Sequence, residues 1–128
     1  MKNFMFSVVA IFLSSCATTY QPLAFSGGYA EIPVDASTYR ISFEGNGYSK
    51  RATVESYLLF RAAELTAAKG FDWFLLAERE GESQTDDRYG QMKIASTAIL
   101  RMYKGEKPTN QGYKAAEVIR VMGPSIKR

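Results

Sequence analysis

Carboxylates, one thiol and a set of tyrosines are the side chains of this 128-residue chain that could do chemistry. The sequence has no histidine and a single cysteine, Cys16. Without histidine the chain lacks the commonest general base, a usual zinc ligand and every Ser-His-Asp arrangement. With one cysteine it cannot form an internal disulfide. The composition therefore predicts no metal site, no cofactor and no catalytic residue of these common kinds.

The densest group of carboxylates lies between residues 78 and 87. Its members are Glu78, Glu80, Glu82, Asp86 and Asp87. A pair of carboxyls about 5 Å apart in a cleft could cleave a glycoside, and several together could bind calcium, although the spacing differs from the EF-hand loop. Two arginines in the same stretch dilute the negative charge. The pattern favours a solvated hairpin end, with calcium binding and catalysis as the alternatives.

Arg61 is the second candidate, because helical spacing places it inside an apolar stripe that should cover the sheet. The stripe consists of Val54, Leu58, Ala62, Leu65 and Ala68. A buried guanidinium without a partner is too costly to persist. Glu64 lies one helical step away, and Glu44 and Glu78 could approach from a sheet. The sequence thus predicts a buried ion pair of Arg61, with Glu64 as a candidate partner. A role for Arg61 in binding an anion or a partner is the alternative.

Aromatic residues form a third candidate group. Its members are Tyr20, Tyr29, Tyr39, Tyr48, Tyr57 and Trp73. They could line a surface for sugar or peptide, but their positions in apolar runs favour strand and core roles. The glycines of "GNGYSK" at residues 45–50 lack the remainder of either phosphate-binding motif. This stretch is therefore predicted to be a turn between a strand and a helix.

The lone cysteine follows a segment with the layout of a secretory signal peptide. Residues 1–15 carry one positive charge, Lys2, and a ten-residue apolar run from Phe4 to Leu13. A helix that spans a bilayer needs about 20 residues, so the run is too short to be a permanent anchor. "LSSC" at residues 13–16 resembles the bacterial lipobox. The resemblance implies cleavage between Ser15 and Cys16 and lipid attachment to Cys16; the alternative is an ordinary secreted protein cut elsewhere.

The lipobox resemblance also implies a location. Two or more acyl chains hold a protein firmly at a membrane, and Ala17, rather than aspartate, after the cysteine is the Gram-negative pattern for export to the outer membrane. Loss of residues 1–15 removes Lys2 and leaves 15 basic against 13 acidic side chains, a formal charge of +2. We expect a lipid-anchored protein on the periplasmic side of the envelope. Nucleic acid is not an expected partner, whereas anionic lipid or cell-wall polymer is compatible with the charge.

The remaining chain is long enough for one domain. We expect a lipidated cysteine and flexible tether over residues 16–28, a domain over 29–123 and a tail over 124–128. Predicted strands are residues 29–34, 38–45, 71–80 and 91–105, with Pro33 confining the first to a sheet edge. A helix over 50–70, capped by Ser49, is the clearest element. Residues 113–122 have helical spacing, with a strand as the alternative.

These elements predict an α+β fold in the order β-β-α-β-β-α. A small, mostly antiparallel four-stranded sheet would carry the long helix on one face. The opposite side of that helix is apolar as well, notably at Leu59 and Phe60. We expect this second side to be covered, either by the C-terminal segment or by a partner molecule, so that Leu59 and Phe60 are a candidate interaction surface.

Two stretches of the domain carry a family resemblance. "GGYAEIPVDASTYRISFEGNGYSK" and "YLLFRAAELTAAKGFDWF", together with "RMYKGEKP" and "AAEVI", are similar to a family of small proteobacterial lipoproteins, typified by alphaproteobacterial members, of uncharacterised function. The resemblance supplies no activity. The expected function is therefore a non-catalytic envelope lipoprotein that contacts another envelope protein or the cell wall. The alternative is a carboxylate-based hydrolase or a domain that binds a small ligand or cell-wall glycan.

Overall fold

The computed structural model describes residues 17–46, 48–86 and 91–128. Their secondary structure runs β1 (Gly28–Asp35), β2 (Thr38–Glu44), α1 (Arg51–Ala68), β3 (Trp73–Asp86), β4 (Gln91–Tyr103), β5 (Tyr113–Lys114) and α2 (Ala115–Met122), followed by a 3-10 turn, η1 (Gly123–Ser125). The predicted α+β class is confirmed. The sheet has five strands rather than four, because the two-residue β5 pairs with the start of β3. The segment 113–122 is thus mainly helix, as its spacing predicts.

The sheet is antiparallel and has the order β1-β2-β4-β3-β5. Pro33 lies on β1, which is an edge strand as predicted, because proline has no N–H to donate to a second neighbour. β3 extends to Asp86, six residues beyond the predicted end of this strand at residue 80. Its backbone ladder can continue through polar residues because backbone pairing does not depend on burying the side chains. A bulge interrupts the ladder after Ala77, where Glu78 has a φ of 50°.

One face of the sheet packs against α1 and forms the core. The strands contribute Ile41, Phe43, Phe74, Ala98, Leu100 and Met102, all buried. From α1, Val54, Leu58, Ala62 and Leu65 are buried as the helical stripe predicts. Ala68, the last residue of the helix, is exposed. The sheet and α1 thus share one core.

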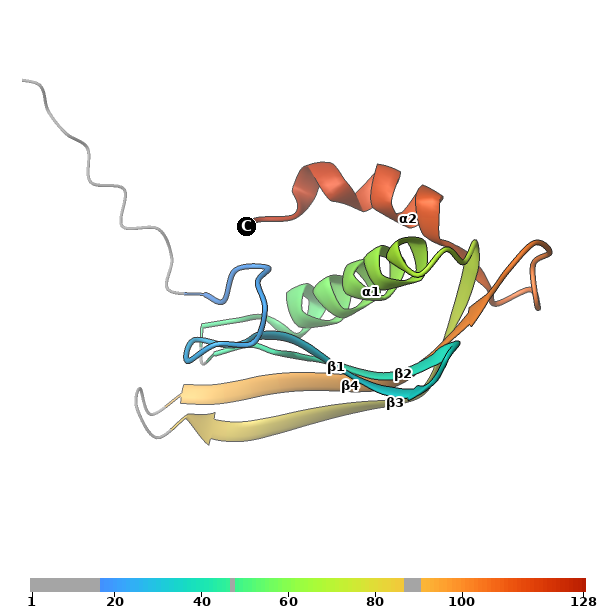
Figure 1. Ribbon diagram of the computed structural model, residues 1–128. Coiled ribbons are helices and arrows are strands. Elements are labelled where there is room, and N and C mark those ends of the chain that lie inside the picture. Colours follow the sequence, from blue (N-terminus) through green and yellow to red (C-terminus); the bar gives the residue numbers. More distant parts are fainter. Residues whose placement is uncertain (1–16, 47, 87–90) are drawn as a thin grey trace, which may run out of the picture.

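The second side of α1 is covered by α2, so the molecule has three layers: sheet, α1 and α2 (Figure 1). Phe60 and Ala63 are buried, and Leu59 is partly buried against the core. The prediction that this side is covered is confirmed, and of its two alternatives the C-terminal segment is the one that the structure shows. Leu59 and Phe60 therefore do not form an exposed interaction surface, because Phe60 is buried and Leu59 is partly buried within the domain.

The segment predicted as a flexible tether packs onto the domain from residue 18 onward. Thr18 and Tyr20 are 5% and 4% exposed. The Tyr20 N–H donates to the carbonyl oxygen of Lys127 at 2.7 Å, which joins the two ends of the described chain. Further backbone bonds tie Gln21 to Tyr29 and Leu23 to Tyr29. The tether boundary at residue 28 was therefore wrong, because an aromatic anchor draws this polar segment into the fold.

The ends of α1 differ from the sequence prediction, because the helix is Arg51–Ala68 rather than 50–70 and its predicted cap is not used. Ser49 does not cap the helix: Lys50 occupies the N-cap and makes no side-chain cap bond. The Ser49 hydroxyl instead accepts the Thr18 N–H at 3.2 Å. At the other end Gly70 has a φ of 83°, the left-handed conformation that glycine adopts most readily after a helix. The strand-to-helix turn thus serves to bind the N-terminal segment.

Candidate functional site

The predicted acidic group is spread along the β3–β4 hairpin. Glu78 and Glu80 are exposed and line a shallow depression of about 200 Å³ beside Arg40. Glu82 and Asp86 belong to β3, but the structure does not describe their side chains, and Asp87 lies outside the described residues. Within residues 17–46, 48–86 and 91–128, no group of three or more acidic side chains is placed to hold a metal ion. The described carboxylates of this hairpin, Glu78 and Glu80, are therefore exposed and line an open depression.

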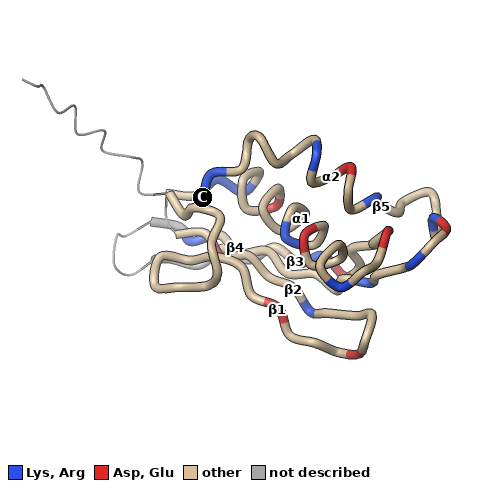
Figure 2. The backbone as a smooth tube through the Cα atoms, turned by 45° about the horizontal axis from the view of Figure 1, so that its top comes forward, with Lys and Arg blue, Asp and Glu red and all other residues tan. Residues whose placement is uncertain are grey.

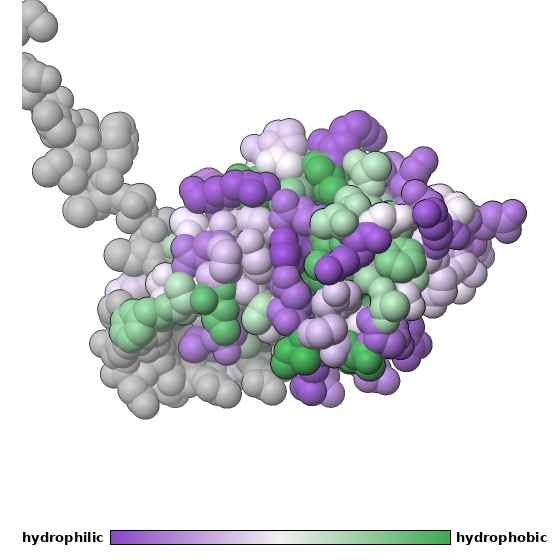
Figure 3. Space-filling model, in the orientation of Figure 1, coloured by the Kyte–Doolittle hydropathy of each residue, from purple (hydrophilic) through white to green (hydrophobic). Residues whose placement is uncertain are grey.

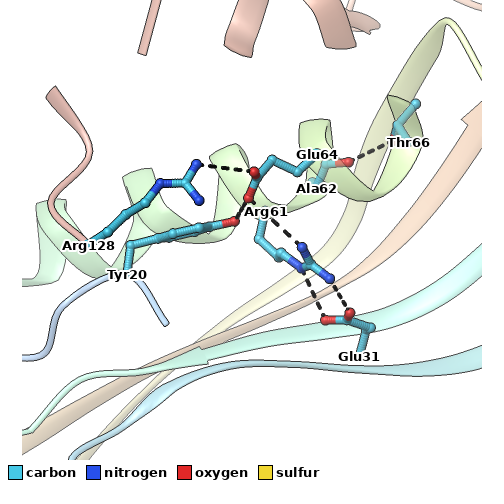
Figure 4. Close-up of polar contacts among 7 residues, drawn as sticks. All are labelled: Tyr20, Glu31, Arg61, Ala62, Glu64, Thr66 and Arg128. Carbon is cyan, nitrogen blue, oxygen red and sulfur yellow. Dashed lines mark hydrogen bonds and ion pairs between the residues drawn. The ribbon is translucent and has the colours of Figure 1, made fainter. Parts of the chain in front are cut away.

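Arg61 is held between the edge of the sheet and its own helix (Figure 4). Its Nη2 lies 2.5 Å from Oε1 of Glu31, and its Nε donates to Oε2 of the same carboxylate at 3.3 Å. The predicted contact with Glu64 is longer, at 3.9 Å. The guanidinium also lies over the Tyr29 ring, 4.2 Å from its centre. Arg61 is thus ion-paired as predicted, but its main partner is Glu31 and the two side chains are 20% and 21% exposed rather than buried.

The other two proposed partners of Arg61 lie elsewhere. Glu44 pairs with Lys93 at 3.5 Å, and Glu78 is exposed at the bulge in β3. Glu31 was not predicted as the partner because it is far from Arg61 in sequence. It lies on a strand whose register is set only when the sheet forms. The alternation of β1, with Tyr29 and Glu31 on the same side, was the available signal.

Tyr20, Glu64 and Arg128 extend these contacts toward the chain ends. The Tyr20 hydroxyl donates to Oε1 of Glu64, and Arg128 Nη2 lies 3.3 Å from Oε2 of the same residue (Figure 4). Burial, followed by the hydrogen bond to Glu64, raises the pKa of Tyr20 well above its usual value. Burial lowers the pKa of Arg61, but Glu31 outweighs it and the net shift is upward. The hydroxyl, carboxylate and guanidinium groups of these residues are hydrogen-bonded or ion-paired with one another, so we interpret their role as stabilising the fold.

A groove of about 1050 Å³ lies at the end of the molecule where the described chain begins. Three segments form it: the N-terminal segment, the first turns of α1 and the C-terminal segment. We call it the N-terminal groove. It is lined by Ala17, Thr18, Thr19, Tyr48, Ser49, Lys50, Ala52, Thr53, Ser56, Tyr57, Met122, Ser125, Ile126, Lys127 and Arg128. Figure 2 shows basic residues gathered around the C-terminus, next to the start of the described chain.

The N-terminal groove has a positive electrostatic character. Lys50, Lys127 and Arg128 line it, and none of its described lining residues is acidic. The side chains of Lys50 and Lys127 form no hydrogen bond or ion pair with any residue that the structure describes. Arg128 is held by Glu64 and lies 5.4 Å from the centre of the Tyr20 ring. Two ammonium groups without a partner among the described residues, and one guanidinium paired with Glu64, thus favour an anionic ligand.

An apolar turn adjoins this groove. Leu23 and Phe25 are 48% and 81% exposed. The turn is anchored beside the groove because the Thr18 hydroxyl donates to the carbonyl oxygen of Ser26 at 2.6 Å. Figure 3 shows apolar surface on the left of the view, at this end of the molecule. The apolar turn is therefore joined by one hydrogen bond to Thr18, which lines the groove.

The N-terminal groove could not be predicted from the sequence because its residues come from three separate segments. "SKR" at residues 49–51 and "IKR" at 126–128 were visible as two short basic clusters. Their proximity depends on the Tyr20 to Lys127 backbone bond and on α2 folding back over α1. Of the predicted aromatic group, Tyr20 and Tyr57 are core residues and Tyr48 lies on the groove rim, 43% exposed. The core interpretation therefore holds for Tyr20 and Tyr57.

Comparison with protein-family models, with curated proteins and with solved structures gave no match to this chain. The resemblance to small proteobacterial lipoproteins therefore stays a prediction. Neither helix in the described part of the chain is both long and apolar enough to cross a bilayer. Ser15 and Cys16, the predicted cleavage and lipid-attachment residues, lie outside the described residues.

Proposed function

We propose that this chain is a lipid-anchored lipoprotein of a Gram-negative cell envelope. Lipid on Cys16 would hold it on the periplasmic side of a membrane, the outer membrane in preference to the inner one. The proposal is supported by the charged and apolar segment before residue 14 and by "LSSC" at residues 13–16. Through its domain the protein would contact another envelope protein or the cell wall without catalysing a reaction.

The short distance between Cys16 and the folded domain carries this proposal. Thr18 is already buried, and its N–H donates to the Ser49 hydroxyl. Because consecutive Cα atoms are about 3.8 Å apart, the Cα atoms of residues 16 and 18 lie within roughly 8 Å of each other. A lipid on Cys16 would therefore keep one end of the domain at the membrane surface. A protein attached in this way suits contacts made close to the bilayer.

The non-catalytic part of the proposal is supported by the residues that line the N-terminal groove and the depression beside Arg40. The N-terminal groove presents cations, hydroxyl groups and apolar carbons, which suit binding of an anion. Of the acidic group that a carboxylate-based hydrolase was predicted to use, Glu78 and Glu80 have described side chains, and these line an exposed depression. Exclusion of water, which strengthens electrostatic catalysis, is absent from so open a surface. In-cell crosslinking of the lipidated protein would identify the protein or polymer that it contacts.

Replacement of Cys16 by alanine tests the anchor. We expect Cys16→Ala to lose all incorporation of labelled fatty acid and to leave an uncleaved or soluble species, because the thiol is the proposed attachment atom. Ser15→Ala is the matched control, since it keeps a small residue before the cysteine and should still be labelled. Density-gradient separation of the two membranes would then locate the labelled protein. Label on the Cys16→Ala protein would contradict the proposal.

A further inference from the structure

We propose that the N-terminal groove binds the phosphate groups of anionic phospholipids, so that this end of the domain lies on the membrane in a fixed orientation. The inference rests on the proposed lipid anchor and adds a second, non-covalent attachment to it. Three observations support it: the position of the groove, its charge and the apolar turn beside it.

The groove lies next to the attachment residue along the chain. Ala17 lines the groove and is bonded directly to Cys16. The Cα atoms of these two residues are therefore about 3.8 Å apart in any chain conformation. The acyl chains on Cys16 enter the bilayer at the level of the lipid headgroups. Headgroups of neighbouring lipids would consequently surround the mouth of the groove, at a high local concentration.

The charges of the groove match such a ligand. Lys50 and Lys127 are exposed, and their ammonium groups form no bond with the described residues, so both can turn toward a phosphate. Arg128 adds a guanidinium that Glu64 holds in place. Basic residues beside a membrane anchor are attracted to anionic lipid, and the attraction falls within a Debye length. Proximity to the bilayer is thus what gives these charges their effect.

The apolar turn supplies contacts that a soluble anion would not use. Phe25 and Leu23 are exposed on the turn that Thr18 fastens beside the groove. Aromatic and leucine side chains next to basic residues are typical of surfaces that lie in the headgroup region of a bilayer. This combination favours a membrane over a small phosphate compound or an acidic protein segment.

A single fluorescent label on the lipidated protein would test the inference. Because lipid occupies Cys16, a new cysteine would be the only reactive thiol. Ser56→Cys places an environment-sensitive dye in the groove, and Ala36→Cys places it in the β1–β2 turn at the far end of the domain (Figure 1). We expect a blue shift only for the groove label, only in vesicles that contain phosphatidylglycerol, and reversed by high salt. Vesicles of phosphatidylcholine alone are the comparison.

Charge reversal sharpens the test. Lys50→Glu with Lys127→Glu should abolish the shift, whereas Lys104→Glu with Lys114→Glu, two exposed lysines away from the groove, should leave it intact. Lys127→Gln alone should reduce the shift and serves if the double variant does not fold. An equal shift in both kinds of vesicle, or one that survives loss of Lys50 and Lys127, would overturn the inference. So would a shift without vesicles that grows with protein concentration, which would indicate a second copy.

The same experiment separates this inference from the proposal beneath it. Flotation of the protein with vesicles of phosphatidylcholine reports the lipid anchor alone. If the protein floats and the groove label does not respond to phosphatidylglycerol, the groove inference fails and the anchor stands. If the purified protein carries no lipid and does not float, the anchor proposal itself fails.

Discussion

Residues 17–28 and 104–112 have similar compositions, but only the first segment packs into the domain. Both are rich in glycine, proline and small polar residues, as "ATTYQPLAFSGG" and "KGEKPTNQG" show. The first packs into the domain, with Thr18, Tyr20, Gly27 and Gly28 buried. In the second, only Pro108 and Gly112 are even partly buried. Composition marks both as irregular, but it does not say which one belongs to the core.

One side chain accounts for most of the difference. The Tyr20 ring lies 4.9 Å from Tyr29, 5.2 Å from Phe60 and 5.6 Å from Tyr57, measured between ring centres. Residues 104–112 contain no aromatic residue, and their anchors are surface hydrogen bonds such as that from Trp73 Nε1 to the carbonyl oxygen of Gly105 at 2.9 Å. A polar segment therefore becomes structural when it brings an aromatic ring to a site already lined with rings.

Removal of the Tyr20 ring should have the largest effect. We expect Tyr20→Ala to lower the free energy of unfolding by about 4 kcal/mol, as for other buried aromatic residues. Tyr113→Ala is the matched control: its ring stacks on Phe74 but is 36% exposed, so its loss should cost about 1 kcal/mol. Urea unfolding followed by circular dichroism would measure both. Equal effects would mean that the N-terminal segment adds no more than a surface contact.

A pair of glycines tests the comparison at the backbone. Gly27 and Gly105 have positive φ angles of 105° and 84°, which strain any other residue. A Cβ on Gly27 would lie 2.3 Å from the carbonyl oxygen of Glu44, whereas nothing lies within 4 Å of one on Gly105. Gly27→Ala should cost about 3 kcal/mol, from strain and overlap together, and Gly105→Ala about 1 kcal/mol.

Urea unfolding of the two glycine variants would measure both costs. A cost for Gly105→Ala as large as that for Gly27→Ala would show that residues 104–112 are held as firmly as residues 17–28. A small cost for both would show that the segment 17–28 can move away from β2 without loss of the core. Either result would remove the distinction between the two regions.

The sequence predicted what repeats along the chain. Helical spacing of Val54, Leu58, Ala62 and Leu65 identified the face of α1 that meets the sheet. Strand patterns likewise predicted residues 29–34 and 38–45, which correspond to β1 and β2. These patterns are local, because periodicity follows from the geometry of a single element. The α+β order and the covered second side of α1 could be predicted for the same reason.

Contacts between distant segments could not be predicted in this way. Arg61 was expected to need a carboxylate, but its choice of Glu31 depends on the position of an edge strand 30 residues away. The N-terminal groove depends in turn on Tyr20, whose burial requires the ring site formed by Tyr29, Tyr57 and Phe60. The Arg61–Glu31 pair and the groove both depend on the assembled fold. A single aromatic residue in a polar segment is too weak a sequence pattern to predict the burial of Tyr20.

The smallest effect concerns the Tyr20 hydroxyl alone. Tyr20→Phe keeps the ring and removes the hydrogen bond to Glu64, which retains Arg128. We expect a loss of about 1 kcal/mol near neutral pH, the usual contribution of one such bond. A loss close to that of Tyr20→Ala would show that the hydroxyl, and not the ring, anchors the segment. Comparison of urea midpoints at pH 7 would distinguish the two cases.

The pH dependence of this difference follows from the raised pKa of Tyr20. Below about pH 10, the usual pKa of tyrosine, the residue is protonated in both the folded and the unfolded chain, so the contribution is complete. Above that pH the unfolded chain releases its proton while the folded domain retains it. Stability then falls by up to about 1.4 kcal/mol per pH unit from this group. Tyr20→Phe lacks the group, so its disadvantage relative to the parent should shrink from pH 10 to pH 11. A gap that stays constant over this range would mean that Tyr20 ionises as readily in the folded domain as in the unfolded chain.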